Sequence, residues 1–294
     1  MMNLALTEKR NPLTKDIDLM TSLEMVTVLN HEDMKVAKAV QKVLPQVAEA
    51  VDIISENFLN GGRLAYFGAG TSGRLGVLDA SECWPTFGVE HGMVCAYIAG
   101  GEKALRFSVE NAEDNRTLAQ ADLKAFNPTK KDTIVGISAG GGAPYVLEIL
   151  EQAQARGVKT IGISSNPNAA LEAFCSVFIN PIVGEEALTG SSRMKSGTAQ
   201  KMILNMLSTA SMIKIGKTYE NYMVDVRMVN KKLLDRGCRI VSQIAGVSYE
   251  KAEALIEKSG NVKTACVMGV LDCSMEKAQE LLLKNKGILR RVIK

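Results

Sequence analysis

The sequence predicts an α/β fold: a doubly wound, mainly parallel five-stranded sheet flanked by helices, with a small C-terminal helical domain. Two observations carry this prediction. Short apolar segments alternate with helical segments up to about Gly190, and only helical segments follow. The chain of 294 residues is long enough for about two domains. We expect a sheet domain with an N-terminal helical extension over residues 1–228, and a helical domain over residues 229–294.

A long helix is predicted before the sheet. Valines from Val36 to Val51 recur every three or four residues within the segment 32–58, which places them on one helical face. Pro45 should bend or split this helix, because proline lacks a backbone N–H and clashes with the preceding turn. The sequence Asn60-Gly61-Gly62 should end it.

Five short apolar segments are the predicted strands. They are residues 63–67, 93–98, 132–138, 159–164 and 176–182. Their alternation with helical segments is typical of parallel βαβ units, whose ligands bind at the carboxyl ends of the strands.

The segments after the sheet are predicted to be helical. Helices are expected at residues 198–215 and, beyond Gly246, at 249–258, 262–271, 275–285 and 288–294. The helix over 198–215 is apolar on several sides and rich in methionine. Such a helix is either deeply buried or covered by a partner subunit. Both interpretations stay open, and the second predicts a homodimer.

The composition excludes several classes of site. His31 and His91 are the only histidines, so a three-histidine metal site is impossible and a histidine-based triad would need one of them. Carboxylates are therefore the expected proton carriers of an enzyme. The six cysteines form no C-x-x-C pair, which argues against a zinc ribbon or a disulfide framework. We expect a cytoplasmic protein without signal peptide or membrane span.

The net charge of +3 is unevenly divided along the chain. Residues 229–294 carry +6 and residues 1–228 carry −3. A basic segment can bind nucleic acid. Here the basic residues alternate with glutamates and no aromatic stacking platform accompanies them, so solvated helix faces are the simpler explanation. We predict no nucleic-acid partner and no membrane partner.

Two glycine turns follow predicted strands and carry hydroxyl side chains. The segment GAGTSG (68–73) matches G-x-G-x-x-G, but no acidic residue ends the second strand, which disfavours a dinucleotide site. Backbone N–H groups, hydroxyls and a helix N-terminus together favour a sugar phosphate or another small anion. The alternative is that the glycines only make tight turns. The predicted phosphate ligands are Gly70, Thr71, Ser72, Ser138, Gly140, Gly141 and Gly142.

Longer motifs resemble a known family. They are GAGTSGRLGVLDASEC (68–83), TGSSRMKSGTAQKMILNMLST (189–209) and GK-x-YEN-x-MVDV (216–226), with shorter matches from Thr7 to Met268. These blocks resemble the N-acetylmuramic acid 6-phosphate etherases, a family built on a sugar-isomerase (SIS) domain. The resemblance covers nearly the whole chain and implies an SIS-type sheet.

The resemblance also implies a reaction. The family cleaves the D-lactyl ether of its substrate to N-acetylglucosamine 6-phosphate and D-lactate by elimination and hydration, which needs neither a metal nor a redox cofactor. Glu82 in DASEC matches the family's proton donor, and Glu113 in AEDN matches its second essential glutamate. Which glutamate serves which proton transfer stays open. Trp84 and Phe87, which follow Glu82 closely, would surround it with apolar groups if they pack over it.

Two departures from the family pattern affect the expected site. The third-strand loop of the family is close to A-S-G-R-T-P, whereas this chain has glycine at 140 and 142 and alanine at 143. Three side chains expected to donate to the phosphate are thus absent. The second departure is Trp84, where the family usually has proline. A related lyase or isomerase for another sugar phosphate, and a non-catalytic regulator resembling glucokinase regulatory protein, are therefore kept as alternatives.

Overall fold

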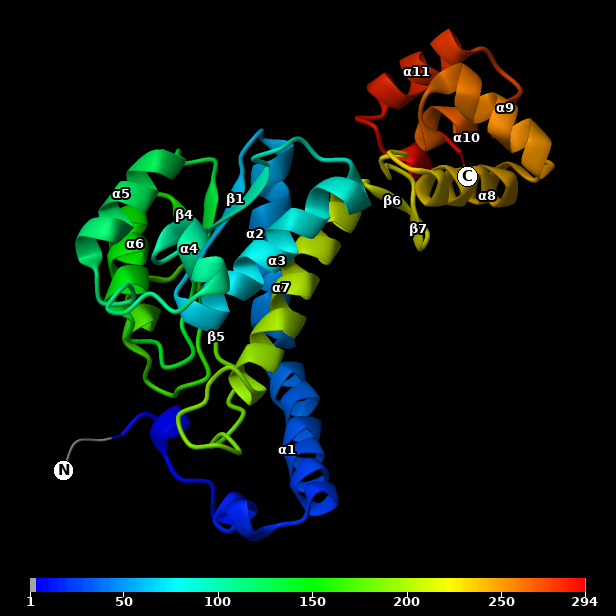
Figure 1. The fold of residues 1–294 in the computed structure, drawn as a ribbon. Coiled ribbons are helices and arrows are strands. Elements are labelled where there is room, and N and C mark those ends of the chain that lie inside the picture. Colours follow the sequence, from blue (N-terminus) through cyan, green and yellow to red (C-terminus); the bar gives the residue numbers. More distant parts are fainter. Residues whose placement is uncertain (1–3, 294) are drawn as a thin grey trace. The chain divides into compact units, whose positions relative to one another are not determined.

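The computed structural model describes residues 4–293 and contains one parallel sheet (Figure 1). Its strands are β1 (Leu64–Gly68), β2 (Val94–Ile98), β3 (Thr133–Ile137), β4 (Lys159–Ile163) and β5 (Val177–Ile179). They lie in the order β2-β1-β3-β4-β5, and every neighbouring pair is parallel. The doubly wound, five-stranded α/β sheet is confirmed, and its strands are all parallel rather than mainly so.

Helices precede, separate and follow the strands. They are α1 (Ser22–Gln41), α2 (Leu44–Leu59), α3 (Gly70–Phe87), α4 (Gly101–Arg106), α5 (Arg116–Phe126), α6 (Pro144–Ala155), α7 (Lys195–Lys214), α8 (Lys231–Ala245), α9 (Tyr249–Ser259), α10 (Val262–Leu271) and α11 (Met275–Lys284). None of the helices within residues 4–293 is long and apolar enough to cross a membrane.

The chain divides into two compact units. The first contains the residues up to Ala80 and from Gly92 to Ser208, and the second contains Ser81–His91 and the residues from Thr209 onward. The sheet belongs to the first unit, and α8 to α11 belong to the second. The domain boundary expected between residues 228 and 229 stays a prediction.

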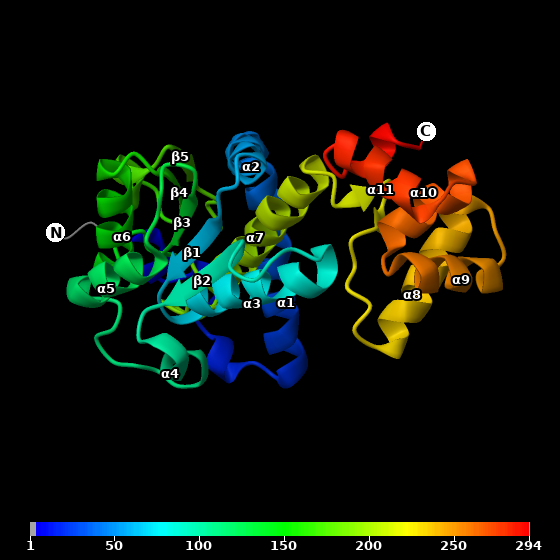
Figure 2. The same cartoon turned by 90° about the horizontal axis from the view of Figure 1, so that it is seen from above.

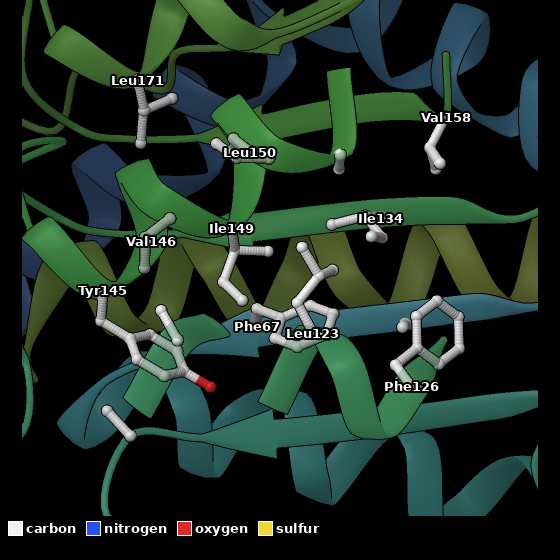
Figure 3. Close-up of a cluster of buried hydrophobic side chains, with 14 of the residues drawn as sticks. Phe67, Leu123, Phe126, Ile134, Tyr145, Val146, Ile149, Leu150, Val158 and Leu171 are labelled. Atoms are coloured by element: carbon white, nitrogen blue, oxygen red, sulfur yellow. The ribbon is translucent and has the colours of Figure 1, made fainter. Parts of the chain in front are cut away.

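Helices cover both faces of the sheet (Figure 2), so β1, which lies between β2 and β3, is buried along its whole length. Successive side chains of β1 point to opposite faces. Phe67 packs with Leu123 of α5 and Ile149 of α6 in the core shown in Figure 3. On the other face, Tyr66 approaches Gly76 of α3 so closely that an added Cβ would lie 2.9 Å from the Tyr66 Cβ.

The N-terminal helix differs from its prediction in one respect. The expected split occurs, because α1 ends at Gln41 and α2 begins at Leu44 with Pro45 in its first turn. However, α1 begins at Ser22, ten residues before the predicted start. Thr21 and Glu24 form a capping box there, while most of the first turns are exposed. Apolar periodicity therefore misses this part of the helix.

The structure also differs from the prediction in the C-terminal part of the chain. Helix α8 was not predicted, although Asn230 caps its start and Gly246 its end. Two short antiparallel strands, β6 (Thr218–Tyr219) and β7 (Tyr222–Met223), interrupt the region expected to be helical alone. Helices α9, α10 and α11 follow the prediction, whereas within 288–293 only a 3₁₀ turn over Leu289–Arg291 forms.

Helix α7 matches the predicted methionine-rich helix. Its side chains Ile203, Leu204, Leu207 and Met212 are fully buried within the chain. Met202 and Met206 are only partly buried and Ile213 is 50% exposed, so burial within the chain accounts for one side of this helix.

Candidate active site

A cavity of about 490 Å³ lies at the carboxyl ends of β1 and β3, where a parallel sheet of this order binds its ligands. Its lining includes the predicted residues Gly70, Thr71, Ser72, Glu113, Ser138, Gly140 and Gly142. The sheet thus brings together residues from three separate parts of the sequence. Gly141 and Glu82 are not among the lining residues.

The first glycine turn has both a packing role and a place in the cavity. A Cβ on Gly73 would lie 2.6 Å from the Ile98 Cγ1 atom, so glycine is required for α3 to begin this close to β2. Gly70 has φ +54°, a conformation that favours glycine. Gly70, Thr71 and Ser72 all line the cavity, whereas Gly73 does not. The close packing of α3 on β2 thus explains Gly73, and the other three residues are available to a ligand.

Ser72 is connected to α7 through Gln200. The Ser72 hydroxyl donates to the Gln200 Oε1 atom at 3.0 Å, and both side chains are buried. The Gln200 Nε2 group has no hydrogen-bond partner within the described chain. If the amide turned by 180°, Nε2 would donate to the Ser72 oxygen and the Ser72 proton would be available to a ligand. Ser72 can therefore act as an acceptor or as a donor in the cavity.

The third-strand turn separates into one structural glycine and two that line the cavity. The Gly141 N–H group donates to the Ser138 hydroxyl at 3.1 Å, which leaves the Ser138 proton available to a ligand. A Cβ on Gly141 would lie 2.2 Å from the Ala169 Cβ atom, so only glycine fits. An added Cβ would touch nothing within 4 Å at Gly142 and only the Thr7 hydroxyl, at 4.0 Å, at Gly140. Packing therefore does not explain the glycines at 140 and 142.

Glu113 lies in the loop between α4 and α5. Its backbone carbonyl accepts a hydrogen bond of 2.9 Å from the Tyr145 N–H group in the first turn of α6. Tyr145 is itself buried, and its hydroxyl donates to Asp122 at 2.7 Å. The Glu113 backbone is thus fixed by the sheet-covering helices, while its side chain is exposed on the cavity wall.

Glu82 lies in the part of α3 that belongs to the second unit, and its side chain is exposed. The expected apolar surroundings are not formed. Residues two apart on a helix point in different directions, and Trp84 instead stacks on His91 with 5.0 Å between ring centroids. Phe87 is buried, five residues beyond Glu82 and outside the i+3 and i+4 positions.

Sequence reasoning missed several residues of the cavity wall. Thr7, Glu8, Asp114, Gly190 and Ser192 also line it. The Thr7 carbonyl accepts from the Gly190 N–H group at 3.2 Å, which holds the N-terminal segment against the loop before α7. Both segments lie within the motifs that carry the family resemblance, and that was the only sequence signal for their proximity.

A buried ion pair supports this arrangement. Glu32 of α1 pairs with Lys195 at the start of α7, and both side chains are 1% exposed. Asn11 donates to Glu32 at 3.0 Å and thereby attaches the N-terminal segment to the pair. Burial alone would raise the pKa of Glu32, but the hydrogen bonds from Lys195, Lys35 and Asn11 hold it below its usual value. Glu32 thus stays ionised and connects three segments.

Comparison with known proteins identifies the family. Family models match residues 35–154 (glucokinase regulatory protein N-terminal SIS domain), 108–210 (SIS domain) and 220–261 (C-terminal lid domain of glucokinase regulatory protein). The chain is 51% identical to the N-acetylmuramic acid 6-phosphate etherase of Pectobacterium atrosepticum, over 97% of this chain and 95% of that protein. The chain belongs to the N-acetylmuramic acid 6-phosphate etherase family.

A second etherase shows the same extent of similarity. N-acetylmuramic acid 6-phosphate etherase 2 of Vibrio cholerae is 52% identical over 97% of this chain and 94% of its own length. Among solved structures, a phosphoheptose isomerase from Francisella tularensis is similar in fold, with a TM-score of 0.52 and 18% identity. It covers 66% of this chain and 100% of its own length. The etherase resemblance and the SIS-type fold predicted from the sequence are both confirmed.

Proposed function

We propose that this member of the etherase family is a carbon–oxygen lyase that cleaves the D-lactyl ether of N-acetylmuramic acid 6-phosphate. The products would be N-acetylglucosamine 6-phosphate and D-lactate, as in amino-sugar and cell-wall recycling. The observation that carries the proposal is the identity of 51% to a named etherase over nearly the whole chain. The cavity that joins Glu113 to two glycine turns supports it independently.

The phosphate is assigned to the two turns. Thr71, Ser72 and Ser138 offer hydroxyls, and the backbone at Gly70, Gly140 and Gly142 can approach an anion closely because these residues carry no side chain. Gly141, proposed from the sequence as a further ligand, would act through the shape of the turn, since its N–H group is used by Ser138.

The carbonyl chemistry is assigned to Glu113 and Glu82. Opening of the sugar ring makes the C2 proton acidic beside the C1 aldehyde. A carboxylate takes that proton, the C3–O bond breaks with its electrons moving to the lactate oxygen, and a carboxylic acid protonates this oxygen. Water then adds at C3 and the C2 proton is returned. Glu113 would remove the C2 proton or assist ring opening, and Glu82 would be the proton donor.

The alternative of a non-catalytic phosphosugar-binding regulator is favoured by one finding. Two of the matching family models describe domains of glucokinase regulatory protein. Both glutamates are retained, however, and the whole-chain relatives are named as enzymes. The same cavity would serve a regulator, so only a measurement of turnover separates the two.

The test is D-lactate release from N-acetylmuramic acid 6-phosphate. We expect turnover by the wild type, and a loss of about 100-fold or more in kcat for Glu82→Gln and Glu113→Gln, because general acid–base groups contribute that much. Glu102→Gln, an exposed glutamate of α4, is the matched control. In heavy-oxygen water the label should enter C3 of the sugar and not lactate. A folded wild type that binds the sugar phosphate but releases no lactate would support the regulator instead.

We also infer that the protein is a cytoplasmic homodimer. Support for self-association comes from α1 and the turn before it, where Leu19, Leu23, Val26 and Met34 are more than half exposed. The spacings of three and eight residues place Leu23, Val26 and Met34 on one side of α1. Because the most apolar side of α7 is already buried within the chain, the more exposed apolar residues of α1 are the basis for the inference.

A further inference from the structure

A second, smaller cavity adjoins the first. It has a volume of about 230 Å³ and shares Ala69, Gly70 and Glu113 with the larger cavity. Its other walls are the start of α3, the end of β2 and the loop that follows α4. Glu113 therefore stands between two adjoining spaces, and the predicted phosphate ligands belong to only one of them.

Arg74 provides a positive charge in the second cavity. Among the described residues that line the two cavities, it is the only lysine or arginine. Its Nε donates to the Leu105 carbonyl at 3.1 Å and its Nη2 to the Phe107 carbonyl at 3.3 Å. These bonds fix the guanidinium against the end of α4. A guanidinium has five N–H groups, so three remain for which the described residues supply no partner.

We propose that Arg74 binds the carboxylate of the lactyl group. This inference rests on the proposed function, because it concerns the second anionic group of the same substrate. A phosphate in the larger cavity and a carboxylate in the smaller one would place the ether bond between them, beside Glu113. The planar guanidinium matches a carboxylate in geometry and in charge, and a fixed guanidinium loses little freedom on binding.

The other charged side chains of the smaller cavity are acidic, so only Arg74 can attract a carboxylate there. Glu110 and Glu113 also line it, and the Ser108 hydroxyl donates to Glu110 at 3.2 Å. Without the guanidinium, a carboxylate entering this space would meet only like charges. Removal of Arg74 should therefore impair binding of the lactyl-bearing substrate and leave ligands without a lactyl group unaffected.

The experiment compares Arg74→Met, Arg74→Lys and the wild type. We expect Arg74→Met to raise KM for N-acetylmuramic acid 6-phosphate by about 10- to 100-fold, the usual effect of a charged hydrogen bond, with a smaller rise for Arg74→Lys. Inhibition by N-acetylglucosamine 6-phosphate, which lacks the lactyl group, should stay within about twofold. Arg106→Met, an exposed arginine of α4, is the matched control.

A substrate whose lactyl carboxyl is converted to an amide gives a readout that a structural role would not change. The wild type should prefer the acid to the amide, and Arg74→Met should lose this preference. A parallel loss of N-acetylglucosamine 6-phosphate binding in both variants would overturn the proposal and assign Arg74 to the phosphate or to the fold. An unchanged KM would also overturn it. If the wild type proved inactive, titration of the uncleaved substrate would give the same comparison, so the two proposals fail separately.

Discussion

At the scale of single residues, the third-strand turn can be tested by restoring a family side chain. A Cβ at Gly142 would have free space around it, and the residue is exposed at the cavity without a left-handed φ. We expect Gly142→Arg to strengthen inhibition by N-acetylglucosamine 6-phosphate about tenfold, because a guanidinium adds a charged contact to the phosphate.

The neighbouring glycine provides the control for this variant. In Gly141→Arg the Cβ would lie 2.2 Å from the Ala169 Cβ, so this variant should lose stability and binding. Unchanged inhibition constants in a folded Gly142→Arg protein would show that the phosphate lies elsewhere.

Some residues of the site could be predicted from the sequence, and others could not. Thr71, Ser72 and Ser138 could be placed in one cavity, because each follows a strand of a parallel sheet and such strands end at the same edge. Thr7 and Glu8 could not, since they precede the sheet by more than fifty residues and no local pattern indicates where that segment folds. Arg74 was also missed as a ligand, because its proximity to α4 depends on how that helix packs.

At the scale of elements, the start of β3 depends on a buried carboxylate. The Asp132 side chain is 2% exposed and accepts from the Arg63 N–H group at 2.8 Å, the Arg63 guanidinium at 2.9 Å and the Thr129 N–H group at 2.8 Å. Burial alone would raise the pKa of Asp132, but the bonds from Arg63 and Thr129 hold it below its usual value.

We therefore expect Asp132→Asn to lower the free energy of unfolding at pH 7 by about 3 kcal/mol, because Arg63 and Thr129 lose a charged partner. Because the pKa of Asp132 is lower in the folded than in the unfolded protein, its ionised form stabilises the folded protein at pH values above the ordinary aspartate pKa of about 4. This stabilisation is lost as the pH falls through the pKa of Asp132 in the folded protein. The difference between variant and wild type in urea unfolding should thus shrink below pH 4. Asp33→Asn, an exposed aspartate of α1, is the control. A constant difference from pH 7 to pH 3 would contradict the argument.

Helices and strands could be predicted where buried side chains produce a recognisable apolar pattern in the sequence. The strands are buried or partly buried and form apolar runs, so all five could be found within a few residues. The first turns of α1 are exposed and carry no such pattern. Helix α8 was not predicted, although Asn230 and Gly246 are ordinary capping residues, because its first turns are charged and mostly exposed and carry no apolar run.

At the scale of the whole molecule, composition and architecture agree with carboxylate chemistry. The chain has two histidines, and neither lines the cavities at the sheet edge, which contain Glu8, Glu110, Glu113 and Asp114. Such acidic surroundings suit proton transfer but oppose two anionic groups of a substrate. In our proposals, hydroxyls and backbone N–H groups bind the phosphate, and Arg74 binds the lactyl carboxylate. All of these groups belong to the first unit.

Self-association is a property of the whole molecule, and substitutions in the single helix α1 can test it. The stripe of Leu23, Val26 and Met34 on α1 is exposed, so the folded chain does not need it. A wild-type dimer should sediment at twice the chain mass of 31.7 kDa, and Leu23→Glu with Val26→Glu should sediment at that mass, because burying two carboxylates opposite their own copies is unfavourable. Ala121→Glu, which adds the same charge at an exposed position of α5, should remain a dimer. A monomeric wild type at assay concentrations would exclude the homodimer, and a dimeric double variant would move its interface away from α1.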